Sequence, residues 1–136
     1  MSARFLLDTN IVSDLVRNPQ GRAAAKIAEV GEDAVATSIV VAAELRYGAA
    51  KKGSQKLLDQ LEAVLGVLNV LPLEAPSDAA YGTARAAIEK AGTPVGGNDL
   101  LVAAQAMALD MVLVTDNEIA VRPLCGLKVE DWFGKQ

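Results

Sequence analysis

The sequence predicts an α/β protein whose parallel sheet is covered by helices on both faces. Short apolar runs, which are candidate strands, alternate with longer segments whose apolar residues have helical spacing. The candidate strands lack polar alternation, which is typical of parallel strands buried on both sides. Because the chain has 136 residues and 51% of them are hydrophobic, we expect one domain, residues 1–136, around a mainly parallel sheet of four to five short strands.

The first half of the chain contains two candidate strands and four candidate helices. Residues 4–8 form an apolar run that ends in an acid, and Thr9 is a suitable N-cap for the helix that follows. Ser38 is a second candidate N-cap, and the helix after it should end near the glycines at 48 and 53. The remaining predictions are a turn at 18–21, helices at 22–30, 39–50 and 54–67, a turn at 31–33 and a strand at 34–37.

The second half repeats the alternation. Pro76 suits the first turn of a helix over 77–91, and Asn98 or Asp99 can cap a strongly apolar helix over 100–109. Residues 91–97 form the most loop-like stretch of the chain. The predicted strands are 69–73, 111–115, which is the clearest, and a short last one at 127–129.

Several classes of protein are excluded by composition. The chain has no histidine, which removes the catalytic triads that need one and the usual zinc hydrolase sites. Its single cysteine, Cys125, cannot form an intramolecular disulfide, and we expect it to be a buried small hydrophobe. No segment reaches the ~18 apolar residues of a membrane helix, and Asp8 interrupts any signal-peptide core, so we expect a cytoplasmic protein without membrane contact.

The net charge bears on possible partners. Thirteen Lys and Arg against seventeen Asp and Glu give −4, which argues against a nucleic-acid binder that relies on a basic patch. An enzyme that meets phosphates through a metal ion is not excluded by this balance.

Four acids have positions of interest. Asp8 and Asp116 each follow a predicted strand, Asp99 opens a helix, and Glu44 lies in an apolar helical stretch. Each has a purely structural interpretation: Asp8 and Asp99 as helix caps, Asp116 as a turn former, and Glu44 as the ion-pair partner of Arg46, Arg85 or another base. The carboxyl ends of parallel strands share one edge of the sheet, however, so these acids should gather there.

A cluster of acids at one edge would repel itself without a cation. Oxygen ligands without histidine favour Mg²⁺ or Mn²⁺ over zinc. A metal held in this way lowers the pKa of a bound water and stabilises charge on phosphate oxygens. The four acids therefore indicate phosphodiester or phosphoryl chemistry.

Five segments, in order and spacing, resemble the PIN-domain ribonucleases, specifically the VapC-type toxins of toxin–antitoxin pairs. The resemblance covers essentially the whole chain, and its segments are Leu6-Leu7-Asp8-Thr9-Asn10, Ala43-Glu44-Leu45-Arg46-Tyr47-Gly48, Asn98-Asp99-Leu100-Leu101-Val102-Ala103-Ala104, Leu113-Val114-Thr115-Asp116-Asn117 and Gly126-Leu127-Lys128-Val129-Glu130-Asp131-Trp132.

This resemblance implies a PIN-like α/β/α sandwich and an endoribonuclease that cuts tRNA or ribosomal RNA, stopping translation and growth. Asp8, Glu44 and Asp99 take three acid positions that hold Mg²⁺ or Mn²⁺, and Asp116 or Asn117 fills the fourth. The side chains implied to orient carboxylates and water are Thr9, Asn10, Thr115 and Asn117. Many relatives carry His where Gln105 stands, and residues 118–122 also depart from the usual pattern, which puts the RNA preference in question.

The resemblance also implies partners. These are a VapB-type antitoxin, a second copy of the chain in a homodimer and, with the antitoxin, a hetero-oligomer. The antitoxin should enter a groove near the acids, framed by the helices at 22–30 and 54–67. Contacts with RNA or antitoxin are expected from Arg46, Lys51, Lys52 and Lys56, although these residues equally suit a solvated helix end.

Two rival functions remain open at this point. An aspartyl-phosphate protein would use Asp8 as nucleophile, but such phosphatases need a second Asp where Asn10 stands. A non-catalytic interaction module with the same fold is the other, and the intact acids argue against it.

Overall fold

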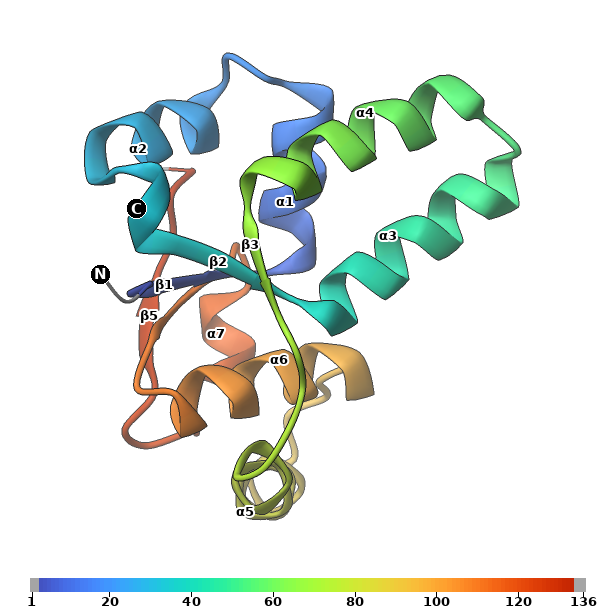
Figure 1. The fold of residues 1–136 in the computed structure, drawn as a ribbon. Coiled ribbons are helices and arrows are strands. Elements are labelled where there is room, and N and C mark those ends of the chain that lie inside the picture. The colour runs from blue at the N-terminus through green and yellow to red at the C-terminus, as the bar shows by residue number, and fades with distance from the viewer. Residues whose placement is uncertain (1–2, 134–136) are drawn as a thin grey trace.

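The computed structural model describes residues 3–133, and a five-stranded parallel sheet forms its centre (Figure 1). The strand order is β3-β2-β1-β4-β5. The strands are β1 (Phe5–Leu7), β2 (Val35–Ser38), β3 (Asn69–Leu71), β4 (Val112–Val114) and β5 (Lys128–Glu130). The predicted α/β class with a parallel sheet is thereby confirmed.

Helices cover both faces of the sheet. The helices are α1 (Thr9–Arg17), α2 (Arg22–Val30), the short 3₁₀ helix η1 (Glu32–Ala34), α3 (Ile39–Lys52), α4 (Gln55–Val67), α5 (Ser77–Ala91), α6 (Gly97–Ala108) and α7 (Glu118–Val121). In Figure 1, α1, α2 and α4 lie on one side of the sheet and α6 on the other, with α5 packed outside α6. Helix α3 packs against both α1 and α6 and extends away from the sheet with α4. No helix in residues 3–133 combines the length and apolar character that crossing a membrane requires.

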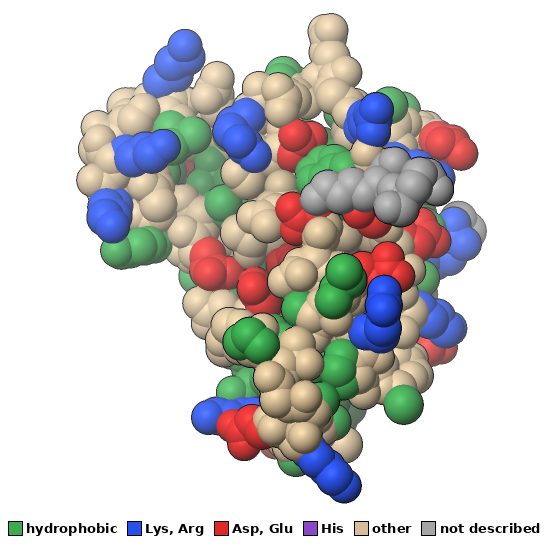
Figure 2. Space-filling view, turned by 180° about the vertical axis from the view of Figure 1, so that it is seen from behind, with side chains coloured by type: hydrophobic (Ala, Val, Ile, Leu, Met, Phe, Trp, Pro, Cys, Tyr) green, Lys and Arg blue, Asp and Glu red, His purple; other side chains and the backbone are tan. Residues whose placement is uncertain are grey.

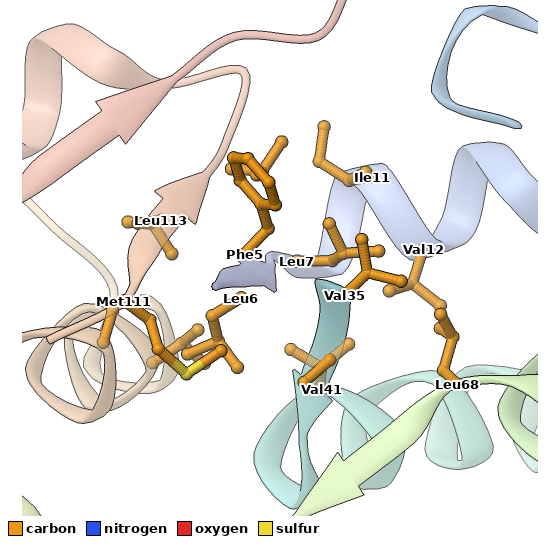
Figure 3. Close-up of a cluster of buried hydrophobic side chains, with 14 of the residues drawn as sticks. Phe5, Leu6, Leu7, Ile11, Val12, Val35, Val41, Leu68, Met111 and Leu113 are labelled. Atoms are coloured by element: carbon orange, nitrogen blue, oxygen red, sulfur yellow. The ribbon is translucent and has the colours of Figure 1, made fainter. Parts of the chain in front are cut away.

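The core forms around the central strand β1. All three of its residues are buried, and Leu6 and Leu7 have no exposed surface. Figure 3 shows Leu6 on the side of Val41 and Met111, whereas Phe5 points to the opposite side. A strand without polar alternation therefore buries both of its faces, as the sequence predicts.

Local chemistry explains where the helices begin. Ser38 caps α3, because its hydroxyl accepts a hydrogen bond from the backbone N–H of Val40 at 3.0 Å. Gly53 closes the same helix in the left-handed conformation (φ 65°), which is costly for other residues. The helix therefore ends near Gly53, as expected, whereas Gly48 lies inside α3 and does not end it.

Three further expectations need correction, and one short helix was missed. Thr9 is the first residue of α1, and Asp8 is its N-cap, because the Asp8 carboxylate reaches the first free N–H of the helix. Helix α6 begins at Gly97 with Gly96 as N-cap, so neither Asn98 nor Asp99 caps it. Cys125 is exposed rather than buried, since it lies in the surface turn before β5. The one-turn helix α7 was not predicted, since four residues are too few for a periodic pattern.

Candidate active site

The fold brings the four acids to the carboxyl edge of the sheet. Asp8 follows β1 directly, and Asp116 lies two residues after β4, which pairs with β1 so that Leu7 is opposite Val114. Glu44 comes from α3 and Asp99 from the first turn of α6. Their charges interact: the pKa of Asp99 is raised by desolvation first and then by the charges of the other three acids. The sequence-predicted cluster is therefore one electrostatic site.

Asp8 is the most constrained of the four. Its side chain is buried, at 8% exposed, and each carboxylate oxygen has a fixed partner. Oδ1 accepts a hydrogen bond from the Thr9 backbone N–H at 2.6 Å, and Oδ2 accepts one from the Thr115 hydroxyl at 2.7 Å. Burial raises the pKa of Asp8, with smaller contributions from Asp116 and Glu44, while the two hydrogen bonds oppose that rise. The fold thus holds a buried carboxylate in one orientation.

Two threonines fix the strand ends beneath Asp8. Thr115 is buried, and its hydroxyl also accepts a hydrogen bond from the Asn117 backbone N–H at 3.1 Å. Thr37, on β2, donates its hydroxyl to the carbonyl of Leu7 at 2.7 Å. Sequence reasoning missed Thr37, because only the strand order reveals that the end of β2 lies beside the end of β1. The Thr37 hydroxyl thus fixes the backbone just before Asp8, and the Thr115 hydroxyl fixes the Asp8 carboxylate itself.

Glu44 depends on a hydroxyl rather than on a base. Its Oε1 accepts a hydrogen bond from the Thr9 hydroxyl at 2.9 Å. The alternative of an ion pair fails, because Arg46 binds Glu62 through two nitrogens at 2.9 and 2.8 Å. Arg85 binds Glu89 at 3.0 Å instead. Thr9 therefore connects the strand end at Asp8 to the carboxylate of α3.

Asp116 and Asn117 differ in their contacts. The Asn10 side-chain amide donates to Asp116 Oδ1 at 3.0 Å, and Asp116 is half-buried. Asn117 is exposed and takes part through its backbone N–H. The carboxylate of Asp116 is thus the group that contacts α1, while the assignment of the fourth position stays a prediction.

Asp99 is the least constrained acid. It is exposed, and within residues 3–133 no hydrogen bond or ion pair involves its carboxylate. As the third residue of α6 it lies near the positive end of the helix dipole, yet its pKa is raised. The causes of the raised pKa are desolvation first and then the charges of the three neighbouring acids.

The donor set suits a hard divalent cation. All four groups are carboxylates, and no ion pair in the described chain joins any of them to a Lys or Arg. Among residues 3–133, however, no three of them lie close enough to hold an ion as they stand. Asp8 and Glu44 are instead held by threonines, and Asp116 by Asn10. Ion binding would therefore draw side chains together from these positions.

The predicted basic residues surround the junction of α3 and α4. Figure 2 shows Lys and Arg side chains on the lobe that these two helices form and acidic side chains nearer the middle of the same face. Arg46 is already bound to Glu62, and the Lys51 ammonium lies 5.9 Å from the centre of the Tyr47 ring. Lys52 and Lys56 form no ion pair within the part of the chain that the structure describes.

An apolar groove lies between α2 and α4, the two helices that were expected to frame one. It has a volume of about 540 Å³, and α2 and α4 supply most of its walls. Its lining residues include Ala24, Ile27, Ala28, Ala63, Val64 and Val67. Helices α2 and α4 thus frame a groove, but none of the four acids lines it.

Known proteins resemble the chain over nearly its full length. The profile of the PIN domain family matches residues 5–122. Ribonuclease VapC2 of Rickettsia felis is 32% identical over 94% of this chain and 97% of its own. A tRNA(fMet)-specific endonuclease VapC of Shigella flexneri is 29% identical over 95% and 98%.

Solved structures give the same result. The VapBC2 complex of Rickettsia felis, bound to a DNA fragment from its promoter, superposes with a TM-score of 0.86 at 30% identity, covering 94% of this chain and 98% of that one. The DNA-bound VapBC complex of Salmonella typhimurium gives 0.84 at 28% identity, covering 96% and 98%. PIN nucleases generally use divalent metal ions, in agreement with the donor set. The chain therefore belongs to the PIN-domain family, and within it to the VapC ribonucleases.

Proposed function

We propose that this chain is a Mg²⁺-dependent endoribonuclease, in which Mn²⁺ can substitute, and that it is the toxin of a toxin–antitoxin pair. The observation that carries the proposal is the gathering of Asp8, Glu44, Asp99 and Asp116 at one sheet edge without a Lys or Arg partner in the described chain. The ribonuclease names of its full-length relatives support the same reaction. The substrate class is RNA, with tRNA or ribosomal RNA as the target that stops growth.

The proposed chemistry divides between the ion and the protein. A divalent ion bound here supplies an activated water and offsets charge on the phosphate. The four carboxylates would hold the ion, and the protein's own task is to keep them ionised and oriented. Thr115 and the Thr9 N–H do this for Asp8 by donating to its oxygens, which opposes the rise in pKa caused by burial. The Thr9 hydroxyl orients Glu44 by donating a hydrogen bond to its carboxylate.

The proposed partner is a VapB-type antitoxin seated in the apolar groove between α2 and α4. The relatives of known structure were solved as VapBC complexes, which supports this partner. The groove is apolar enough to bind an amphipathic segment, and it lies apart from the four acids. The resemblance to the VapC-type toxins also implies a homodimer, which we include in the proposal.

Cleavage of RNA by the purified chain tests the proposal. Single-stranded RNA is incubated with Mg²⁺, with Mn²⁺ and with EDTA, for the wild type and for Asp8→Asn. We expect cleavage only with metal, 5′-phosphate and 3′-hydroxyl ends, and loss of both cleavage and growth inhibition in Asp8→Asn. Cleavage and growth arrest that persist in Asp8→Asn, or in EDTA, would refute the proposal.

A further inference from the structure

A second, smaller cavity opens directly beside the carboxylate edge. It has a volume of about 190 Å³ and lies between α1, α3 and α4. Glu44 forms part of its wall, so the cavity borders the candidate active site. The other lining residues are Ser13, Val16, Arg17, Leu45, Gly48, Ala49, Lys52, Leu57 and Leu61.

Arg17 and Lys52 line this cavity, and neither forms an ion pair within residues 3–133. Arg17 donates its Nε hydrogen to the carbonyl of Ser13 at 3.4 Å, and no other hydrogen bond or ion pair in residues 3–133 uses its guanidinium. Lys52 likewise forms no ion pair in the described chain. This differs from Arg46 and Arg85, whose guanidinium groups are bound to glutamates. The cavity therefore presents positive charge that the protein itself does not neutralise.

Helix geometry sets the distance between these cations and the acids. Lys52 lies eight residues after Glu44 on α3, which is about 12 Å along the helix axis. Arg17 lies at the far end of α1 from Asp8, about 13 Å along that axis. Neither cation forms an ion pair with the acids within residues 3–133. Along a substrate strand, both would be free to meet a phosphate next to the one being cut.

The remaining walls suit a nucleobase. Val16, Leu45 and Leu57 supply apolar surface in the same cavity as the two cations. Gly48 also borders the cavity, and a Cβ added there would meet no atom within 4 Å. An apolar wall can pack against a nucleobase, and the cations beside it can bind the phosphate of the same strand. Single-stranded RNA exposes both groups, whereas the bases of a duplex are stacked and paired.

We propose that this cavity is a nucleotide subsite: it takes an unpaired nucleotide next to the scissile phosphate, with Arg17 and Lys52 binding the flanking phosphate. The inference rests on the proposed ribonuclease function. It adds the place to which the substrate strand continues beyond the carboxylates. RNA is favoured over an acidic segment of a protein partner, because the cavity shares Glu44 with the site through which the strand must pass. A protein partner has the larger apolar groove between α2 and α4.

Charge removal is the first test. Arg17→Gln, Lys52→Gln and the double variant are compared with Lys90→Gln, which removes a cation from the exposed end of α5. Binding of a fluorescein-labelled single-stranded RNA of mixed sequence is measured by anisotropy at several salt concentrations, alongside KM and kcat for its cleavage. We expect each cavity variant to weaken binding roughly three- to tenfold, mainly through KM, and to reduce the salt slope by about 0.7 per lost contact.

Filling the cavity is the second test. Gly48→Leu adds a side chain at the cavity, and Gly82→Leu adds the same side chain in α5, where a Cβ also meets nothing within 4 Å. Both replace a mid-helix glycine, so both should be folded and at least as stable as the wild type. We expect Gly48→Leu to raise KM for RNA several-fold and Gly82→Leu to leave it unchanged.

The outcomes separate this inference from the proposed function. If the wild type cleaves RNA while the cavity variants keep its KM and salt slope, the subsite is refuted and the ribonuclease stands. If the wild type binds RNA without cutting it and the cavity variants lose that binding, the subsite is supported and the proposed reaction fails. If these variants weaken only the inhibition by an antitoxin, a protein partner occupies the cavity and the inference is overturned. If the wild type neither binds nor cuts RNA, both fail.

Discussion

Asp8 and Asp99 carry the same side chain at the same edge of the sheet, but the fold holds them in opposite ways. Asp8 is buried, and both of its oxygens accept hydrogen bonds from Thr9 and Thr115. Asp99 is exposed, and no hydrogen bond in the described chain fixes its carboxylate. Both have a raised pKa, and in both cases desolvation is the largest cause.

The difference divides the site into a carboxylate that the fold fixes, Asp8, and one that it leaves free, Asp99. The sheet positions Asp8 in advance, because strand pairing places Thr115 beside it. Asp99 sits on a separate helix and feels the other three acids as repulsion. A cation bound between Asp8 and Asp99 would attract both carboxylates and so replace their repulsion. The constrained Asp8 and the unconstrained Asp99 would therefore act together only when the ion is present.

The largest expected effect comes from removing either carboxylate. Asp8→Asn and Asp99→Asn each keep side-chain size and remove a charge, so each should reduce metal-dependent RNA cleavage by at least about a thousandfold, on the order of 4 kcal/mol. Asp78→Asn is the matched control, because Asp78 is also an acid in the first turn of a helix, α5. Single-turnover rates measure all three. Wild-type rates in Asp99→Asn would remove this residue from the site.

An intermediate effect is expected at Thr115. Thr115→Val keeps the shape and removes the hydroxyl that lowers the pKa of Asp8, so that pKa should rise further. We expect a roughly 10- to 100-fold loss of cleavage, as is usual when a group that orients a metal ligand is removed. The acid side of the pH–rate profile should also move to higher pH. Thr83→Val, on the exposed face of α5, is the control.

A loss of rate in Thr115→Val without any shift of the pH profile would contradict the assigned role. In that case the hydroxyl would support packing rather than the ionisation of Asp8.

A smaller effect concerns stability without metal. The pKa of Asp8 is raised in the folded state above its usual 3.8, so the folded protein binds that proton more tightly than the unfolded chain does. This stabilisation is complete below that usual value and is lost as pH rises through the folded pKa. Asp8→Asn removes the buried charge and should therefore stabilise the metal-free protein at pH 7, and by less near pH 4.5.

Thermal unfolding in EDTA at the two pH values measures this difference. Asp99→Asn should change the melting temperature less than Asp8→Asn, because Asp99 is exposed. A melting temperature that is lower in Asp8→Asn than in the wild type at pH 7 would show that its hydrogen bonds outweigh its burial.

The smallest effect is expected at a surface ion pair. Glu89 also accepts a hydrogen bond, from Arg85, but both side chains are exposed. Arg85→Gln should leave both the melting temperature and RNA cleavage indistinguishable from the wild type, since exposed pairs in helices contribute little. A clear loss in either measurement would mean that a hydrogen bond to an exposed carboxylate, such as Glu89, contributes as much as one to a buried carboxylate, such as Asp8.

The sequence predicts the parts of this fold that depend on local patterns. The apolar run at 4–8 and the serine at 38 indicate a strand and a helix start, and the structure contains both. Helix boundaries set by a short polar motif were less predictable. Helix α6 starts at Gly97, and its N-cap Gly96 has no side chain to form a capping hydrogen bond. The usual preference for Asn or Asp as N-cap therefore does not indicate this boundary.

For the site, the sequence identifies the acids but not what holds them. Asp8, Glu44, Asp99 and Asp116 are recognisable from their places at strand ends and in apolar helices. Thr37 and Arg17 were missed, because their importance depends on strand order and on the packing of α1 against α3 and α4. Such long-range neighbours have no signature in the spacing of residues.

Calorimetric titration of Mn²⁺ tests the central claim most directly: that a cation joins the constrained and the free carboxylates. The wild type, Asp8→Asn, Asp99→Asn and the control Asp78→Asn are titrated at pH 7 without RNA. We predict binding to the wild type and the control, loss of at least tenfold in affinity in both site variants, and weaker binding at lower pH as the carboxyls take up protons. Equal Mn²⁺ affinity in all four proteins, or no binding to the wild type, would contradict the account.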